Sequence, residues 1–440
     1  MRIWTFNHYA STPDEQMTAP FDIAKALVRK GHEVTIFASS FSHYKFLELK
    51  LRKSETWQVE VLDGVRFVWV RTFPYCRNDW RRILNMASFA WRTWRVSKKL
   101  SDSPDVIVGV TVHPLAALTG ACLAKKYNVP FVYEVRDLWP LTLIEFGRIS
   151  ARGPLAFGLI WLERITAKRA TAIVTTMPGG PDHFEKLGIP RRITKWIPNG
   201  LDISRFDTLK PYDGTLSKCV TFMYIGGHVY ALALEVILRA SQVIERRGER
   251  DVRFVFVGGG QERQHLIRLA QNLGLRRVEF RGVVPKAELP QIMQEADAFL
   301  VSMRDRPALY QHGISFNKLC DYMAAGRPII FAGNPGYNAV EKAQAGIVVP
   351  PERPEAIVKA IEQFLALTPE ERRQMGQNGQ RYVKEHHDIR ILTDKMEAVL
   401  LAAVSEHGGP SAERVKAAPS RPPDQSELHE VARGGSKNGQ

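Results

Sequence analysis

Residues 313–331 read GISFNKLCDYMAAGRPIIF and predict a polar loop, a helix and a buried strand in succession. Ser315 stands where it could cap the helix, Lys318 falls in its first turn, and the helix is expected to end at Gly326. A helix N-terminus has free backbone N–H groups, and a lysine beside it makes a site for an anion. Asp321, one turn further on, could accept hydrogen bonds from a sugar hydroxyl. The stretch therefore predicts either a nucleoside-diphosphate pocket or an ordinary surface helix with a capping serine.

Short apolar runs alternate with helical patterns along the chain, which is typical of parallel sheets wrapped by helices. The expected strands are residues 2–7, 34–38, 106–110, 131–135, 172–176, 220–225, 254–257, 278–280, 298–301 and 329–331. Pro, Gly and Asp cluster at residues 197–202 and 207–218, and the alternation restarts after them. We therefore predict an α/β fold of two tandem, Rossmann-like doubly wound domains facing a cleft. Ligands in such sheets bind beyond the carboxyl ends of the strands.

The break divides the chain into a predicted first domain, residues 1–200, and a second domain, residues 201–385. A helix at residues 386–404 is expected to pack back on the first domain. Residues 406–440 are rich in Gly, Pro, Ser and Lys and hold almost no aromatic side chains. Such a segment buries too little apolar surface to fold, so it is predicted to be a disordered tail.

The composition is that of a soluble globular protein, with 45% hydrophobic and 24% charged residues in a chain of 440. Four cysteines without CxxC spacing argue against a disulfide framework or a zinc site and suggest a reducing compartment. The N-terminal apolar run is too short for a signal peptide, and no stretch approaches the roughly 20 apolar residues of a membrane span. We therefore expect a cytoplasmic protein that uses neither a metal nor a cofactor.

The net charge is +15, and its excess is concentrated in one segment. Between residues 44 and 100, thirteen lysines and arginines stand against five acidic residues. A basic patch of this kind implies an anionic partner, such as a nucleic acid, an acidic membrane or a lipid phosphate.

Residues 80–100 predict a helix with one basic stripe and a broad apolar surface. The stripe residues alternate in spacing between four and three: Arg81, Asn85, Ser88, Arg92, Arg95 and Lys99. Basic residues beside tryptophans favour insertion at an anionic membrane surface, so the expected membrane-binding residues are Arg81, Trp91, Arg92, Trp94, Arg95 and Lys99. The alternative is a helix packed on the sheet with solvated arginines. Nucleic acid is not favoured, because no binding module is recognisable.

Two glycine-rich loops follow predicted strands of the second half. Gly226-Gly-His228 ends the first strand, and Gly258-Gly-Gly-Gln-Glu262 lies between a strand and a helix. Glycines at such turns let a phosphate approach the backbone, although no full dinucleotide fingerprint is present. The alternatives are ordinary tight turns and, for His228, a solvated loop histidine.

The segment Glu134-Val-Arg-Asp-Leu-Trp-Pro140 places three ionisable groups at the end of a buried strand. Charged residues there are unusual for packing and typical of an active cleft. The alternative is a buried ion pair that holds the following loop.

Taken together, these segments resemble retaining glycosyltransferases of family four, which have the GT-B fold. The resemblance covers roughly residues 1–400 and is carried, in order, by ALVRKGHEVTIFASSF, YEVRDLWP, LERITAKRATAIVTTM, WIPNGLDISRF, FVGGGQERQHL, GVVPKAELPQIMQEADAFL and SFNKLCDYMAAGRP. YEVRDLWP and NKLCDYMAAG look most like the branch that builds O-antigen and capsule, including N-acetyl-fucosamine transferases. The resemblance implies metal-independent transfer of a hexosyl or N-acetylhexosaminyl group, with retained configuration, from a nucleoside-diphosphate sugar, with UDP expected. The first domain would hold the acceptor and the second the donor.

Several positions depart from the family pattern. Asp321 takes the place of the second glutamate of the family's E-x7-E motif, which binds ribose, whereas Gly313 stands where the first glutamate would be. Arg136 falls where many members carry a histidine near the transferred sugar. The family's Gly-Arg and Lys-Gly are replaced by Gly226-Gly-His228 alone, and its first glycine pair by residues 12–18.

We infer that Lys318 and nearby backbone N–H groups replace the missing cationic pair. The expected catalytic residues are Arg136, Asp137 and Lys318. The expected donor-binding residues are Gly226, Gly227, His228, Gly258, Gly260, Glu262, Val284, Gly313, Ser315, Phe316, Asn317 and Asp321.

The expected partners are a nucleotide-sugar donor, a glycan acceptor linked to a polyprenyl diphosphate, and the anionic cytoplasmic face of the membrane. Two other functions stay open. One is a sugar-nucleotide epimerase of the same architecture, and the other is a sugar-nucleotide-binding assembly partner without catalysis.

Overall fold

The computed structural model describes residues 1–12, 19–43, 45–76, 79–248, 251–408 and 413. The predicted tail therefore lies almost entirely outside the described residues, as does most of the loop at residues 12–18. Two sheets with flanking helices make up the fold, and the predicted α/β class is confirmed.

The first sheet has eight strands in the order β10-β9-β8-β7-β1-β2-β6-β5. Its strands are β1 (Arg2–Phe6), β2 (Glu33–Ser39), β5 (Trp57–Leu62), β6 (Val65–Val70), β7 (Val106–Thr111), β8 (Phe131–Val135), β9 (Ala172–Thr175) and β10 (Thr194–Trp196). The central β1 pairs in parallel with β2 and β7, whereas β5 and β6 form an antiparallel hairpin at one edge. This hairpin was not predicted from the sequence: β5 is only partly buried and lacks the apolar run of a central strand, whereas the buried run of β6 was overlooked. A separate two-stranded ribbon consists of β3 (Phe41–Ser42) and β4 (Leu47–Glu48).

The helices of this half are α1 (Ala19–Arg29), α2 (Arg81–Val96), α3 (Pro114–Tyr127), α4 (Leu141–Glu145), α5 (Pro154–Lys168) and α6 (Gly180–Lys186). Local signals explain the bounds of α3. His113 caps it by accepting a hydrogen bond from the N–H of Ala116, and Pro114 occupies its first position. Asn128 then ends the helix in the left-handed conformation.

The second sheet has six parallel strands in the order β13-β12-β11-β14-β15-β16. They are β11 (Val220–Ile225), β12 (Val252–Val257), β13 (Val278–Arg281), β14 (Ala298–Ser302), β15 (Ile329–Ala332) and β16 (Gly346–Val349). The following helices accompany it: α7 (Leu234–Arg247), α8 (Arg263–Asn272), α9 (Leu289–Met293), α10 (Pro307–Tyr310), α11 (Asn317–Ala324), α12 (Ala339–Ala343), α13 (Pro354–Ala366) and α14 (Pro369–His386).

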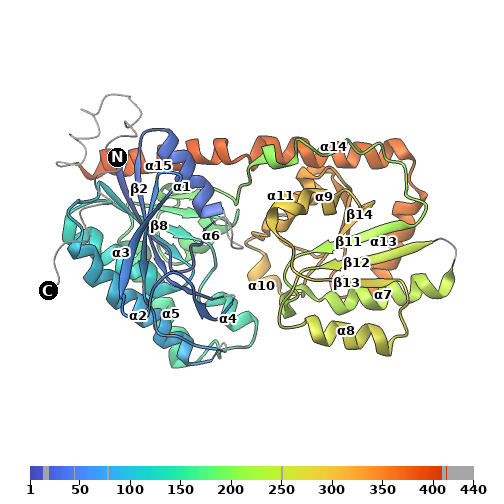
Figure 1. The fold of residues 1–440 in the computed structure, drawn as a ribbon, viewed down its shortest axis with the longest axis horizontal. Coiled ribbons are helices and arrows are strands. Elements are labelled where there is room, and N and C mark those ends of the chain that lie inside the picture. The colour runs from blue at the N-terminus through green and yellow to red at the C-terminus, as the bar shows by residue number, and fades with distance from the viewer. Residues whose placement is uncertain (13–18, 44, 77–78, 249–250, 409–412, 414–440) are drawn as a thin grey trace. The chain divides into compact units, whose positions relative to one another are not determined.

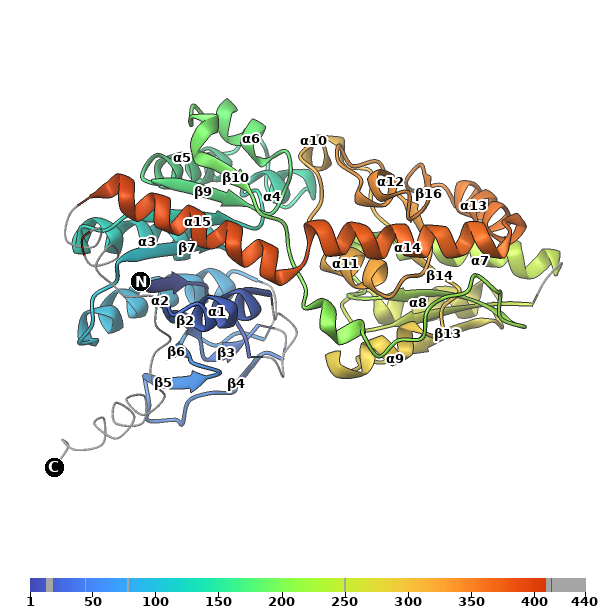
Figure 2. The same ribbon diagram turned by 90° about the horizontal axis from the view of Figure 1, so that it is seen from above.

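Successive residues of β11 enter different cores, because strand side chains alternate between the two faces of a sheet. Phe222 and Tyr224 join a cluster with residues of α7, α8 and α13, whereas Met223 and Ile225 join a cluster with residues of α11 and α14. Figure 1 shows α7 and α8 on one side of this sheet and α11 on the other. In the turned view of Figure 2, α12 and α13 lie next to β16. Both faces of the sheet are therefore covered, and the carboxyl ends of its strands are left for binding.

The described chain forms two compact units. The first comprises residues 1–10, 23–132 and the chain from residue 397, and the second comprises residues 11–22 and 133–396. Within the first unit, the last turns of α15 (Ile389–His407) are tied to the loop after α1. Glu397 binds Lys30 at 2.5 Å and His32 at 2.7 Å. A domain boundary at residue 200 remains a prediction.

None of the helices in the described parts of the chain is long and apolar enough to cross a membrane.

Candidate active site

Two glycine loops interlock at the carboxyl ends of β11 and β12. The backbone N–H of His228 donates to the carbonyl oxygen of Gly259 at 2.7 Å. A Cβ on Gly258 would lie 2.1 Å from the carbonyl oxygen of Gly226, and one on Gly260 would lie 2.4 Å from that of His228. The φ angles of Gly258 and Gly260 are 129° and 142°. Only glycine fits such positions, so the tight-turn interpretation by itself accounts for these two residues.

The imidazole of His228 is fully buried beside these loops, so the alternative of a solvated histidine is wrong. Among the described residues, neither ring nitrogen has a hydrogen-bond partner. Burial lowers the pKa of His228 to about 4, and the positive charges of Arg263 and Lys318 contribute. A buried polar group without a hydrogen bond lowers the stability of the fold. Both ring nitrogens of His228 are therefore available to a ligand.

Lys318 points back from α11 to the first glycine loop. Its Nζ donates to Tyr224 Oη at 2.9 Å, and a Cβ on Gly226 would lie 3.2 Å from that nitrogen. Burial lowers the pKa of Lys318 to about 7. The Nε of Arg263, at the start of α8, is also buried without a partner among the described residues. His228, Lys318 and Arg263 therefore present nitrogen donors around the glycine loops, as an anion requires.

Sequence reasoning missed Arg263. Its position was the available signal, because it is the first residue of the helix that follows the Gly258 loop. Glu262 and Gly227, which the sequence did single out, also belong to the loops. The N–H of Glu262 donates to the carbonyl oxygen of His228 at 3.0 Å, and the carbonyl oxygen of Gly227 accepts from Tyr224 Oη at 2.7 Å. Val284 lies elsewhere, partly buried against the α11-side core.

The helix α11 begins without a side-chain cap, and Phe316 is its N-cap residue. The predicted capping role of Ser315 is wrong, because its hydroxyl instead accepts a hydrogen bond from Asn199 Nδ2 at 2.6 Å. No described side chain therefore competes for the first N–H groups of α11. Asn317, the first helical residue, is exposed.

Asp321 lies half-buried one turn into α11. Burial raises its pKa to about 6, while the charges of Lys286 and Arg205 act in the opposite direction. Arg205 also binds Asp22 at 3.2 Å. The sequence did not single out Lys286 or Arg205, which lie far from Asp321 along the chain. Once ionised, the carboxylate can accept hydrogen bonds from paired hydroxyl groups.

Gly313 has a φ angle of 87°, and a Cβ there would lie 2.7 Å from Pro178 Cδ. A glutamate at this position would combine backbone strain with a steric clash. The missing first glutamate of the E-x7-E motif therefore has a local structural reason.

Arg136 belongs to a chain of hydrogen bonds that ends at the loop before α11. Its Nη1 donates to Glu134 Oε1 at 2.8 Å and its Nη2 to Asn199 Oδ1 at 2.6 Å. Asn199 in turn donates to Ser315, as described above. The ion pair expected as the alternative is thus present, and Arg136 also connects the end of β8, through Asn199, with the loop before α11. Asp137 is exposed, and sequence reasoning missed Asn199, although WIPNGLD contains it.

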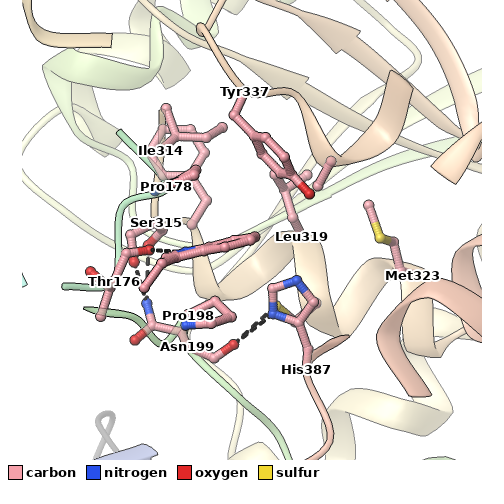
Figure 3. Close-up of a pocket in the computed structure, with 14 residues that line it drawn as sticks. Thr176, Pro178, Pro198, Asn199, Ile314, Ser315, Leu319, Met323, Tyr337 and His387 are labelled. Atoms are coloured by element: carbon pink, nitrogen blue, oxygen red, sulfur yellow. Dashed lines mark hydrogen bonds between the residues drawn. The ribbon is translucent and has the colours of Figure 1, made fainter. Parts of the chain in front are cut away.

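A pocket adjoins this network and encloses about 470 Å³ of empty space open to solvent. Figure 3 shows its apolar wall, to which Leu319 and Tyr337 contribute. His387 Nδ1 donates to the carbonyl oxygen of Asn199 at 2.7 Å across its floor (Figure 3). Ser315 lines this pocket, whereas the three nitrogen donors around the glycine loops do not. From α11, the pocket is lined by Leu319, Cys320 and Met323 and not by Lys318.

Two protein-family models match the chain. The glycosyl transferase 4-like domain covers residues 18–200, and the glycosyl transferases group 1 domain covers residues 219–366. Each half of the chain therefore matches a glycosyltransferase domain. The chain belongs to the GT-B glycosyltransferases.

This glycosyltransferase is similar to a putative colanic acid biosynthesis glycosyl transferase, WcaI, from Escherichia coli. The two are 23% identical over 375 residues, which cover 79% of this chain and 87% of WcaI. Among solved structures, sucrose-phosphate synthase from Thermosynechococcus elongatus superposes with a TM-score of 0.72 at 17% identity, covering 92% of this chain and 99% of that one. Anabaena HepE in complex with UDP gives a TM-score of 0.66 at 16% identity, with 91% and 100% covered. At this low sequence identity, the similarity to these solved structures supports the fold alone.

The helix α2 of this glycosyltransferase presents only part of the predicted polar stripe to solvent: Arg81, Arg95 and Lys99 are exposed, whereas Asn85 is buried and Ser88 and Arg92 are partly buried. Asn85 is buried and donates to Thr72 Oγ1 at 2.8 Å, so its amide serves packing. The Nη1 of Arg92 is also buried. The exposed side instead carries large apolar residues, Trp80 (63% exposed), Ile83 (61%), Leu84 (39%) and Trp91 (56%), together with Arg81, Arg95, Lys98 and Lys99. The outward face is therefore more apolar than the sequence indicated.

A second polar cluster lies at the carboxyl ends of β1 and β7, within the first unit. His8 Nδ1 and His113 Nε2 are 2.6 Å apart, and His113 Nδ1 accepts from the N–H of Ala116. His113 must therefore carry its proton on Nε2 and donate it to His8. Burial and the charge of Arg82 lower the pKa of His113 to about 3, and Arg82 also donates to Tyr9 Oη at 3.2 Å. The sequence did not reveal this cluster, because its members are far apart along the chain.

Within the described residues, no group of three or more His, Cys, Asp or Glu side chains is arranged to hold a metal ion. Metal independence remains a prediction.

Proposed function

We propose that this glycosyltransferase moves a hexosyl or N-acetylhexosaminyl group from a UDP-sugar to a lipid-linked glycan, with retained anomeric configuration. The synthesis of a cell-surface polysaccharide such as O-antigen or capsule is the proposed context. Support comes from the name of the relative WcaI, which refers to colanic acid biosynthesis, and from HepE, which was solved with UDP. The proposed division of labour places the acceptor on residues 1–200 and the donor on residues 201–385.

One observation carries the donor side of this proposal. His228, Lys318 and Arg263 bring nitrogen donors to the two interlocked glycine loops, and two of these side chains hold buried, unpaired nitrogens. A diphosphate would satisfy them and would at the same time favour the charged form of Lys318. Asp321 would accept hydrogen bonds from the ribose hydroxyls, and the uncapped start of α11 would offer its N–H groups.

The proposed reaction breaks the bond between the sugar's anomeric carbon and the diphosphate on the face that the acceptor hydroxyl approaches. The departing phosphate takes the acceptor proton, so no strong protein base is required. The protein's task is to neutralise the leaving diphosphate and to position both substrates. Arg136 and Asp137 are proposed to act on the transferred sugar or the acceptor, because they follow β8 at the carboxyl edge of its sheet.

A lipid-linked acceptor requires the enzyme to work at a membrane, and we propose peripheral binding on the cytoplasmic face through α2. Its outward apolar residues would enter the interface, and its basic residues would meet anionic headgroups. Changing Arg81, Arg95, Lys98 and Lys99 together to glutamate is expected to release the protein from anionic vesicles. Arg239, Arg246, Arg247 and Arg268, four exposed basic residues on α7 and α8, give the matched charge control when changed to glutamate. Wild-type protein that ignores anionic vesicles at low salt would contradict membrane binding.

The deciding experiment supplies a panel of UDP-sugars and a short glycan on a polyprenyl diphosphate. The expected product is an extended lipid-linked glycan whose new linkage keeps the donor's anomeric configuration, as read by NMR. Arg263→Ala should abolish transfer, whereas Arg268→Ala, an exposed change on the same helix, should not. Epimerised donor without transfer would identify an epimerase, and UDP binding without any product would identify a non-catalytic partner.

A further inference from the structure

An ordinary surface helix buries large apolar residues and exposes polar ones. The helix α5 does the opposite. Its buried residues are small or polar: Ala156, Glu163, Thr166 and Ala167. Its first turns instead expose Leu155 (56%), Phe157 (62%) and Trp161 (63%). Glu163, the one acid on the helix, faces inward and binds His183 at 3.1 Å. The apolar side of α5 is therefore outside, with no partner element over it in the described chain.

The exposed charged residues on α5 itself and in the loop before it are all of one sign. Across residues 146–170, which the structure describes without a gap, the exposed charged side chains are Arg148, Arg152, Arg164, Lys168 and Arg169. Along one side of α5, the apolar pair Phe157 and Trp161 is followed by Arg164 and Lys168, at steps of four, three and four residues. A molecule that binds this face must therefore be apolar where it contacts Phe157 and Trp161 and negatively charged around them.

We propose that the outward face of α5 is a second membrane-binding surface, which inserts Leu155, Phe157 and Trp161 into an anionic bilayer. Helix α5, labelled in Figures 1 and 2, would lie along the interface with its rings among the acyl chains and its basic residues at the headgroups. A tryptophan at the end of such an apolar patch suits the headgroup level. This inference extends the membrane binding proposed for α2 but rests on different residues and does not depend on the proposed reaction.

Charge complementarity favours a lipid over a second copy of the chain. A symmetric dimer through this face would bring five basic residues opposite the same five residues. Anionic lipids instead attract each of them, and a bilayer accepts exposed aromatic rings without a shaped partner surface.

The test places a reporter directly on the helix. Gly158 lies on the exposed side of α5, and a Cβ there would meet no atom within 4 Å, so Gly158→Cys should be tolerated. Gly282, on a loop of the same unit, has equally open space and gives the matched control site. The exposed Cys76 is first changed to serine, and each new cysteine is labelled with a fluorophore sensitive to polarity. Vesicles contain either phosphatidylglycerol and phosphatidylcholine or phosphatidylcholine alone.

The expected result is a blue shift of the label at position 158 on anionic vesicles at low salt, with no shift at position 282. In a sedimentation assay, Phe157→Ser with Trp161→Ser should weaken binding at least tenfold, whereas Val59→Ser with Val61→Ser, a pair exposed on β5, should not. The α2 charge variant should lower overall binding without removing the shift at position 158 in the protein that still binds. Bound protein whose label at 158 stays in water would overturn the proposal. So would a concentration-dependent dimer that Phe157→Ser abolishes.

Discussion

Replacing Lys318 by alanine tests the donor side most directly. Its Nζ lies against Gly226 and donates to Tyr224 Oη, so the structure already directs the amine at the glycine loop. A hydrogen bond from an ammonium to a phosphate oxygen contributes roughly 1.5–3 kcal/mol. A loss of about 2 kcal/mol corresponds to about a 30-fold rise in the Kd for UDP. The same loss is expected for the intact donor, because the contact involves the diphosphate.

The pH dependence of this binding separates Lys318 from its neighbours. With a pKa of about 7 in the free protein, Lys318 is largely neutral at pH 8, and a bound diphosphate must raise that pKa. UDP binding should therefore take up a proton. Affinity should be highest below pH 7, fall by up to about tenfold per unit above it, and level off above the pKa of the complex. Asp321, with a pKa of about 6, titrates in wild type and variant alike, so the difference between them isolates the lysine.

The assay is calorimetric titration of UDP between pH 6 and pH 9 in two buffers of different ionisation enthalpy. Tyr224→Phe serves as a companion, because it removes only the hydroxyl that accepts from Lys318 and should keep the pH slope. Arg239→Ala, on the exposed side of α7, controls for the loss of a positive charge. A folded Lys318→Ala protein with unchanged affinity, or with the wild-type pH slope, would refute the reasoning.

Three further outcomes follow from the same geometry. Asp321→Asn keeps the side-chain shape but loses the charge, so the donor KM should rise more than kcat falls. A collapse of kcat with donor binding intact would instead place this carboxyl at the reacting centre. Arg136→Ala should lower turnover by about tenfold or more with little change in UDP affinity. The melting temperature of the variant checks that it is folded. Normal turnover would show that the ion pair between Arg136 and Glu134 is only structural. Gly313→Ala should lower the free energy of unfolding by about 1–3 kcal/mol, because the φ angle of Gly313 is positive and Pro178 occupies the space that a Cβ would need. An unchanged midpoint of denaturant unfolding would show that the loop adapts.

The strands and the chain-wide alternation could be predicted because they depend on local patterns. Each predicted run of apolar residues became a strand, and the loops that follow β11 and β12 lie at the carboxyl edge where binding was expected. The edge strand β5 was missed because a half-exposed strand has a weaker apolar signal, whereas β6 was missed although its residues are apolar and buried. The capping role of Ser315 was wrong for a different reason. Its hydroxyl bonds to Asn199, a residue 116 positions away, and no local rule includes such a partner.

The helices α2 and α5 show the limit of periodicity. A helical period identifies which residues share a face, but it identifies the buried face only when one face alone is apolar. Both helices carry large apolar residues on more than one side. In α2, the inward Asn85 donates from Nδ2 to Thr72 Oγ1 and to the carbonyl oxygen of Phe73, and in α5 the inward Glu163 is paired with His183. These partners lie outside α2 and α5 themselves, so the helical period does not include them.

The sequence by itself determined the alternation of the predicted strands with helices, the glycines that the two loops require, and the placement of Lys318 and Asp321 one turn apart on a single helix. All of these follow from interactions within a few residues. Tertiary structure alone decided that His228 is buried, that Lys318 meets Tyr224, and that Arg263 joins them. The pKa of Lys318 was decided in the same way, because desolvation depends on every atom packed around the amine and not on its neighbours in the chain.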